Sequence, residues 1–260
     1  MIKDIDALLN KAKLEIRAQT DIAVIGLSGG ADSTLVAVLC ALALGKENIY
    51  GVHMPYGDYD YAKFNLNSKK ISSRIGIKDV IIPIGYTVDD LVNKFESRSI
   101  KLSTINRGNM RSRIRMVTLY TFNYNLAEET GKRCRVIGTG NLSEDYIGFD
   151  TKGGDALADF FPIGSLFKSE VYQLLDYFVS IGMLTEELID RVPSAGLWDG
   201  QTDEGELGYS YNEMEPSIKR CMTGAIDINN PIDQFVLKRH LANKHKHVGP
   251  LVIDLSEFRK

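Results

Sequence analysis

IAVIGLSGGADST, residues 22–34, is the most informative stretch of this chain. Its apolar beginning, residues 22–27, predicts a buried β-strand, and an apolar-periodic helix is predicted over residues 33–44. The turn between them holds paired glycines, hydroxyl side chains and the carboxylate of Asp32. Paired glycines let successive N–H groups point into one concavity, and the helix N-terminus adds partial positive charge. The turn is therefore predicted to bind phosphate.

Two better known phosphate loops do not fit this turn. No Gly-Lys-Ser/Thr follows the glycines, which excludes a Walker A loop, and the three-glycine spacing of a dinucleotide-binding turn is missing. The remaining alternative is an ordinary strand-to-helix turn in which Asp32 or Ser33 caps the helix. Capping requires neither the glycine pair nor Ser28, so we favour the phosphate site.

The composition is typical of a globular protein, and we expect the 260 residues to form one domain, residues 1–260. The formal net charge of −3 argues against a dedicated nucleic-acid binder. Cys40, Cys134 and Cys221 are far apart in sequence, which favours free thiols and a reducing compartment. No signal peptide or membrane span is visible, so a cytoplasmic location without membrane partners is expected.

The first half of the chain alternates between predicted strands and helices. Strands are predicted over residues 22–27, 48–54, 79–83 and 135–139, and helices over 3–18, 33–44, 61–75, from Thr87 with a cap, and 107–129. This alternation predicts a three-layer α/β fold, a doubly wound and mostly parallel sheet flanked by helices. Ligands bind at the carboxyl ends of such strands, so the turns after them are expected to converge. These ends are marked by Leu27, Met54, Pro83 and Gly138.

The second half is less regular. Helices are predicted over residues 168–181, 185–190 with Thr185 as cap, 209–222 and 231–243, and a long loop over 193–208. That loop is rich in Gly, Asp and Glu, which predicts a long functional or mobile loop.

GTGNLSE, residues 138–144, follows the fourth predicted strand as the phosphate turn follows the first. Thr139 is expected to hydrogen-bond a nucleotide, and Glu144 to share a divalent cation with Asp32, because Mg²⁺ prefers a few carboxylate oxygens plus phosphate. The alternative is that Thr139 caps a helix and Glu144 lies in its solvated first turn.

Basic residues elsewhere also suggest ligand contacts. Lys168 begins a predicted helix, where a cation is disfavoured by the helix dipole, so it is expected to serve a bound anion. In residues 109–116 the arginines lie among apolar residues, which favours one arginine facing a ligand or a subunit interface over a solvated basic face. His240, His245 and His247 have no acidic or cysteine partner close by in sequence, so no metal site is expected there.

SGGADS, residues 28–33, resembles the signature of the N-type ATP pyrophosphatases, which cleave ATP between its α- and β-phosphates. Later segments resemble one family among them, the NAD synthetases. These segments are GNMRSRIRM at 108–116, GTGNLSE at 138–144, TKGGDALAD at 151–159, PIGSLFK at 162–168 and PSAGLWDGQTDEGELG at 193–208. Residues 213–230 match no motif, and we assign them no function.

The resemblance implies roles for individual residues. The pyrophosphate and ATP would be held by Ser28, Gly29, Gly30, Asp32, Ser33, Thr139, Lys168 and Ser194, of which Asp32, Lys168 and Ser194 would be catalytic. The substrate deamido-NAD⁺ would contact Arg115, Lys152, Asp159, His245 and Lys246. Mg²⁺ would be bound by Asp32 and Glu144.

The implied reaction has two steps. The nicotinate carboxylate attacks the α-phosphorus of ATP and releases pyrophosphate, and ammonia then displaces AMP to give NAD⁺. Glutamine-dependent relatives carry an amidase domain ahead of this part, whereas 27 residues precede Ser28 here, so ammonia is the expected donor. A homodimer with the substrate site near its interface is also implied.

Two alternatives remain. A tRNA-thiolating enzyme of the same superfamily predicts nucleic-acid affinity and catalytic cysteines, which the acidic balance and scattered cysteines disfavour. A nucleotide-sensing module without turnover would tolerate loss of the metal carboxylates, yet Asp32 and Glu144 are both present.

Overall fold

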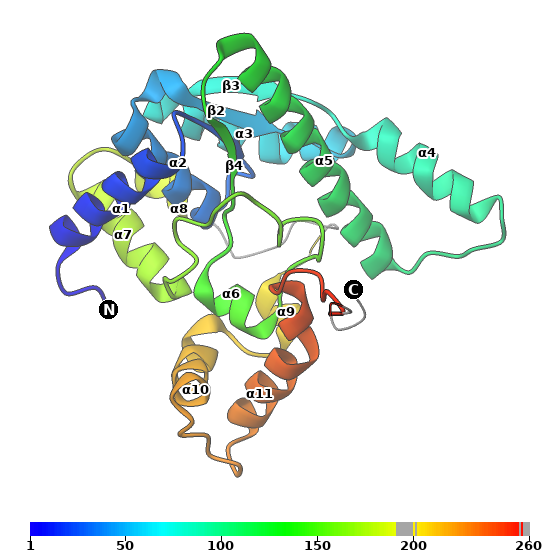
Figure 1. Cartoon of the computed structure of the whole chain (residues 1–260). Helices are drawn as coiled ribbons and strands as arrows, with labels where there is room; N and C mark the ends of the chain where they lie inside the picture. Colours follow the sequence, from blue (N-terminus) through cyan, green and yellow to red (C-terminus); the bar gives the residue numbers. More distant parts are fainter. Residues whose placement is uncertain (191–199, 201, 255, 257–260) are drawn as a thin grey trace.

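A parallel β-sheet lies at the centre of the fold (Figure 1). The computed structural model describes residues 1–190, 200, 202–254 and 256, and their side chains outside residues 58–66. Within these residues the sheet has the strand order β3-β2-β1-β4. The strands are β1 Ile22–Gly26, β2 Ile49–His53, β3 Lys78–Ile81 and β4 Cys134–Ile137. The four predicted strands are confirmed, each ending one or two residues earlier than expected.

Strand β1 lies between β2 and β4, and this position produces a crevice at one edge of the sheet. Ala23 pairs with Ile49 on one side and with Arg135 on the other, both in parallel register. The chain runs outward from β1 through β2 to β3 and then crosses to β4 on the far side of β1. The connections after β1 and β4 therefore diverge at their carboxyl ends, which leaves a crevice where α/β sheets bind ligands.

Helices cover both faces of the sheet, which confirms the predicted three-layer, doubly wound fold. One face carries α1 Ile5–Gln19, α2 Ala31–Leu44, α3 Gly57–Ile75 and α7 Lys168–Ser180. The other carries α5 Thr104–Thr130, with α4 Gly85–Glu96 beside it. The short helices η1 Lys46–Asn48 and α8 Glu186–Ile189 complete this part.

Local sequence explains several helix ends. The side chain of Asp4 caps α1 by accepting from Ala7 N, and that of Ser103 caps α5 by accepting from Asn106 N. The predicted cap at Thr87 is wrong, because α4 begins earlier, at Gly85, after Ile84 without a side-chain cap. Helix α2 is buried around most of its surface, so its residues are apolar on every side.

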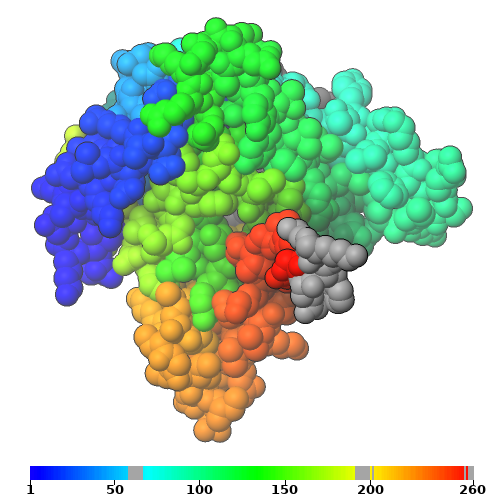
Figure 2. All heavy atoms as spheres, viewed as in Figure 1, coloured from blue at the N-terminus to red at the C-terminus, as the bar shows by residue number. Residues whose placement is uncertain are grey.

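A lobe built mainly from the C-terminal part lies beneath the sheet, and its residues 211–243 are seen in orange in Figure 2. It contains α6 Leu142–Ile147, α9 Asp203–Leu207, α10 Tyr211–Thr223, α11 Pro231–Asn243 and η2 Lys244–Lys246. A separate apolar cluster around Met214, Ile218 and Val236 holds the lobe together. Part of the predicted 193–208 loop is helical instead, because the Thr202 side chain accepts from Gly205 N and caps α9.

Two further features concern the whole chain. Cys40 and Cys134 are buried free thiols and Cys221 is half-buried, as expected for the first two. Burial raises the pKa of the Cys40 thiol to about 12. Among the described residues, none of the helices combines the length and apolarity that crossing a bilayer requires.

Candidate active site

A cavity of about 530 Å³ opens at the carboxyl ends of β1, β2 and β4. Leu27, Met54 and Gly138, which mark three of the predicted strand ends, all line it. The turn after β3, including Pro83, does not, because β3 is the edge strand farthest from the crevice between β1 and β4. Convergence of the turns is thus confirmed for three strands and wrong for the fourth.

The predicted phosphate turn forms one wall of this cavity. Gly29 has a left-handed φ of 79°, and a Cβ there would lie 3.1 Å from the backbone nitrogen of Ser68 in α3. Asn67 Nδ2 donates to Gly29 O at 2.9 Å, so α3 fixes the turn from below. Ser28 Oγ and Ser33 Oγ are 3.0 Å apart, and this hydrogen bond joins the two ends of the turn.

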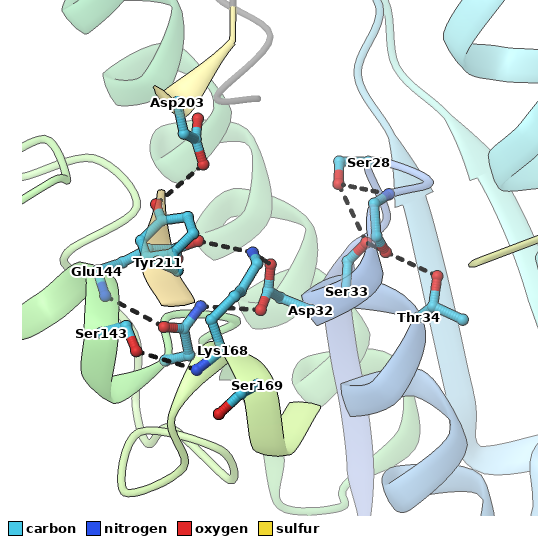
Figure 3. A network of polar contacts seen from close by, with 12 residues as sticks. Ser28, Asp32, Ser33, Thr34, Ser143, Glu144, Lys168, Ser169, Asp203 and Tyr211 are labelled. Atoms are coloured by element: carbon cyan, nitrogen blue, oxygen red, sulfur yellow. Dashed lines mark hydrogen bonds and ion pairs between the residues drawn. The ribbon is translucent and has the colours of Figure 1, made fainter. Parts of the chain in front are cut away.

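The alternative of an ordinary capped turn is wrong. The N-cap of α2 is Gly30, and it has no side-chain cap. Ser33 Oγ donates back to Gly30 O at 3.2 Å, and the Asp32 carboxylate points away from the helix start toward Lys168 (Figure 3). The helix N-terminus is therefore left facing the cavity, which favours an anion there.

Lys168, Asp32 and Glu144 form the charged centre of the site. The Lys168 ammonium lies 2.6 Å from Asp32 Oδ2 and 2.8 Å from Glu144 Oε1, as Figure 3 shows. The three side chains come from α7, α2 and α6, and the lysine is 5% exposed whereas each carboxylate is 18% exposed. Two carboxylates surround one ammonium, so the cluster carries a net charge of −1 when all three groups are ionised.

Burial dominates the acid–base properties of this cluster. It raises the pKa of Glu144, and the nearby Lys168 ammonium only partly opposes this effect. Burial alone would lower the pKa of Lys168. The carboxylates of Asp32 and Glu144 raise it by more than burial lowers it, so the net shift is upward and the ammonium stays charged. A further cation near Glu144 would favour its ionised form.

The GTGNLSE segment passes along the opposite wall. Asn141 caps α6 by accepting from Glu144 N at 3.1 Å, and its amide donates to Asp32 Oδ1 at 2.9 Å. The alternative in which Thr139 caps this helix is wrong, and Thr139 lines the cavity instead. A Cβ at Gly138 would meet the Phe161 ring at 2.3 Å, so the segment needs glycine there.

The residues predicted to contact deamido-NAD⁺ fall into two groups. Arg115 and Lys246 line the cavity, with Arg115 Nε donating to Met54 O and Lys246 Nζ to the carbonyls of residues 148 and 150. Lys152, His245 and Asp159 do not line it. Lys152 Nζ donates to His245 O at 2.9 Å, beside Lys246.

Asp159 lies along the edge of the sheet. Its carboxylate accepts from Val136 N at 2.7 Å, and its own N–H donates to Val136 O at 2.9 Å. Phe160 continues this pairing with Ile137 as an isolated parallel bridge. The side chain is therefore engaged with β4 in this arrangement, a position that the sequence pattern alone did not indicate.

The structure adds acidic residues that the sequence did not single out. Asp145 and Asp150 line the cavity, and burial raises the pKa of Asp145 to about 7, helped by the Asp150 carboxylate. Asp150 also lies 2.7 Å from His247 Nε2, so this histidine has an acidic neighbour in space although none was noted in sequence. The ligand atoms of Asp145, Asp150 and His247 lie within 4.8 Å of one another.

Asp203 of α9 and Tyr211 of α10 are also new to the site. Tyr211 Oη donates to Asp203 Oδ2 at 2.9 Å, and its ring centroid lies 5.4 Å from Lys168 Nζ. Asp203 lies within the predicted 193–208 loop, so its region but not its role could be found from sequence. Ser194 and half of the predicted 193–208 loop, residues 193–199 and 201, lie outside the described residues.

Comparisons with known proteins agree with this geometry. The NAD synthase family model matches residues 2–249. The NH(3)-dependent NAD(+) synthetase of Methanocaldococcus jannaschii is 36% identical, over 95% of this chain and 96% of its own. That of Methanosarcina acetivorans is 38% identical, over 92% of each chain.

Solved structures give the same result. NMN synthetase from Francisella tularensis is similar with a TM-score of 0.80 and 26% identity, covering 98% of this chain and 100% of that one. The NH3-dependent NAD synthetase from Campylobacter jejuni has a TM-score of 0.73 and 28% identity, covering 96% and 100%. Because the family model spans residues 2–249 and the relatives from Methanocaldococcus jannaschii and Methanosarcina acetivorans are 36% and 38% identical over more than nine tenths of their length, the chain belongs to the NAD synthase family.

Proposed function

We propose that this chain is a ligase that amidates deamido-NAD⁺ with ammonia and converts ATP to AMP and pyrophosphate. The observation that carries the proposal is the position of Lys168 between Asp32 and Glu144, directly beside the phosphate turn. This arrangement suits charge neutralisation on a transferring phosphoryl group. Relatives named NH(3)-dependent NAD(+) synthetase support the choice of nitrogen donor and product.

ATP would bind with its phosphates on the turn. Ser28, Gly30 and Ser33, which line the cavity, would hold the pyrophosphate portion, where backbone dipoles and hydroxyl groups meet a helix N-terminus. Gly29 does not line the cavity and is kept as a proposed contact on the resemblance alone. Thr139, across the cavity, would contact the nucleotide, and Lys168 would face the phosphates. Ser194 is proposed as a further ATP contact on the resemblance alone.

The residues present fit Mg²⁺. Asp32 and Glu144 offer hard carboxylate oxygens on either side of one lysine, and the raised pKa of the buried Glu144 indicates that its negative charge lacks full compensation. We propose that these two residues hold the ion. When bound, Mg²⁺ would supply charge neutralisation at the phosphate oxygens.

The proposed reaction uses no protein nucleophile. In the first step the nicotinate carboxylate oxygen bonds to the α-phosphorus, the bond to the bridging oxygen of the β-phosphate breaks, and pyrophosphate leaves. In the second step ammonia bonds to the activated carbonyl carbon, AMP leaves with the former carboxylate oxygen, and one ammonia proton is released to solvent. Lys168 orients the phosphates and offsets their growing negative charge, while the phosphate turn fixes the direction of attack.

The substrate would extend from the phosphates toward Arg115 and Lys246, which line the same cavity. Lys152 and His245, in contact with each other next to Lys246, would reach the more exposed end of the dinucleotide. We keep Asp159 as a proposed contact, which requires its carboxylate to leave Val136 N when substrate binds.

We further propose a homodimer. Helix α5, which carries Arg115, exposes large apolar side chains: Ile105 is 60%, Val117 52% and Tyr124 66% exposed. A second copy covering this helix would bury them next to the substrate end of the cavity. Cytoplasmic location, a single working domain and the absence of nucleic-acid partners remain part of the proposal, the last supported by the net charge of −3.

A second candidate substrate is the corresponding mononucleotide. The neighbour from Francisella tularensis is named NMN synthetase, and its TM-score of 0.80 exceeds the 0.73 of the Campylobacter jejuni NAD synthetase. Amidation of a deamido-mononucleotide would use the same phosphate turn and the same Lys168. Only the dinucleotide would also fill the space toward Lys152 and His245.

One experiment tests both candidates. Purified protein is incubated with ATP, Mg²⁺, ammonium and either deamido-NAD⁺ or its mononucleotide, and AMP and the amide product are measured by chromatography. The proposal expects NAD⁺ and AMP in equal amounts and none after chelation of Mg²⁺. No amide from either substrate, with folded protein, would contradict the proposed function.

A further inference from the structure

The start of α7, where Lys168 lies, lacks an ordinary cap. The residue at its N-cap is Phe167, whose side chain has no hydrogen-bond acceptor. The first backbone N–H groups of a helix have no partner within the helix and must find one elsewhere. Lys168 N and Ser169 N are two of these groups.

Their acceptors come from distant parts of the chain. Lys168 N donates to Ser143 Oγ at 3.0 Å, and Ser169 N donates to Glu215 Oε1 at 3.0 Å. Ser143 Oγ in turn donates to the same Glu215 Oε1 at 3.0 Å, and Ser169 Oγ donates to Glu215 Oε2. The Ser143 hydroxyl, held by Glu215, and the Glu215 carboxylate itself thus together replace the missing cap. Figure 3 shows Ser143 and Ser169 beside Lys168.

Glu215 lies deep in the lobe. It belongs to α10 and is 4% exposed, so its carboxylate is held by the hydrogen bonds just described and by the positive end of α7. That negative charge also offsets the unfavourable interaction between the Lys168 cation and the start of its own helix.

These contacts reach both partners of the charged cluster. Ser143 precedes Glu144 in α6, and Ser169 follows Lys168 in α7. The position of Glu215 therefore sets the starts of α6 and α7 relative to each other, and with them the separation of the Glu144 carboxylate and the Lys168 ammonium.

We infer that Glu215 is a positioning residue for the reaction, which holds Lys168 and Glu144 in register from α10. The inference rests on the proposed function and gives a role to one residue of the segment 213–230, to which the sequence assigned no function. Glu215 does not line the cavity, so it acts through Ser143 and Ser169 and not on the substrate itself.

The test compares Glu215→Ala with Glu215→Gln. Glutamine keeps an acceptor for Ser169 N, and its NH₂ group can donate to Ser169 Oγ, whereas alanine removes every contact. We expect Glu215→Ala to lower kcat for pyrophosphate release about tenfold or more with KM for ATP changed less than threefold. Glu215→Gln should keep kcat within about threefold of wild type.

Glu213→Ala is the matched control. Glu213 lies in the same helix and, as an exposed residue, caps it by accepting from Ser210 N at 2.8 Å, without touching α7. It should loosen α10 yet leave kcat per folded molecule unchanged. Thermal denaturation of all variants, with kinetics measured well below each midpoint, separates lost folding from lost positioning.

The outcomes are distinct. An inactive wild type contradicts the proposed function. An active wild type with Glu215→Ala inside twofold of its kcat, or with equal losses in Glu215→Ala and folded Glu215→Gln, overturns the inference. If Glu215→Ala does not fold, Ser143→Ala decides, since it removes the hydroxyl between Lys168 N and Glu215: a fall in kcat supports positioning, and a wild-type kcat overturns it.

Discussion

Two ion-pair clusters in this protein are built differently. In the active-site cluster, one ammonium from Lys168 meets two carboxylates, those of Asp32 and Glu144. In the lobe, the guanidinium of Arg220 meets the single carboxylate of Asp233, which is fully buried and also accepts from Asp227 N. The first cluster has surplus negative charge when Glu144 is ionised, and the second is balanced.

The pKa shifts follow this difference. Burial raises the pKa of Glu144, whereas hydrogen bonds from Arg220 hold the pKa of Asp233 well below its usual range. A balanced pair stabilises a fold and needs nothing more. An unbalanced one costs stability until another cation arrives, which is the behaviour expected of a binding site.

The largest effect is expected for Lys168→Met. This variant leaves two carboxylates without their ammonium and removes the cation that would face the phosphates. We expect kcat/KM for ATP to fall about 1000-fold, equivalent to about 4 kcal/mol of transition-state stabilisation. The control is Lys219→Met on α10, whose exposed ammonium lies over the Phe167 ring and should be dispensable for turnover. Equal activities of the two variants would contradict the assignment.

Asp32→Asn should have the next largest effect. It keeps the side-chain shape and an acceptor for Asn141, but removes one charge from the proposed Mg²⁺ site. Pyrophosphate release should fall about 100-fold while circular dichroism stays unchanged. Wild-type release from folded Asp32→Asn would remove Asp32 from the metal site.

The unbalanced cluster also predicts a pH dependence of stability. Because the pKa of Glu144 is raised by folding, the stability contributed by this group is complete at acid pH and is lost as pH rises through the folded-state pKa. The proposed Mg²⁺ ion would bind the ionised carboxylate and should restore the lost stability. The rise in melting temperature caused by Mg²⁺ should be larger at pH 9 than at pH 6, and disappear in Asp32→Asn. A rise independent of pH would contradict this.

Asp233→Asn tests the balanced pair, and no effect on kcat is expected. Loss of its charged hydrogen bonds should lower the free energy of unfolding by about 2 kcal/mol at neutral pH. Since folding lowers the pKa of Asp233, its stabilisation is present above the unfolded-state pKa and is lost as pH falls through the folded-state value. Urea denaturation should therefore show a smaller deficit at pH 3 than at pH 7.

The parts of the fold that depend on local sequence could be predicted. The strand, turn and helix of residues 22–44 follow from an apolar run, a glycine pair and an apolar period, all adjacent in the chain. The meeting of Asp32 and Glu144 could also be predicted, because both follow strands that end at the same edge of the sheet.

What could not be predicted depends on partners far apart in sequence. The cap of α7 comes from Glu215, 46 residues after Ser169, because Phe167 cannot supply one. The motif around Asp159 resembles a substrate-binding segment, yet the Asp159 carboxylate accepts a hydrogen bond from Val136 N of β4. Neither pairing leaves a periodicity or a spacing that a single sequence reveals.

Because Cys40 is buried in α2, its reaction with an alkylating reagent reports on the unfolding of that helix. Its thiol lies in the helix that begins beside the phosphate turn, and with its pKa raised to about 12 it has almost no reactive thiolate at neutral pH. Cys221, half-buried in the lobe, is the more accessible of the two. Alkylation of Cys40 would therefore measure how often α2 opens, and substrates that bind the folded protein should slow it.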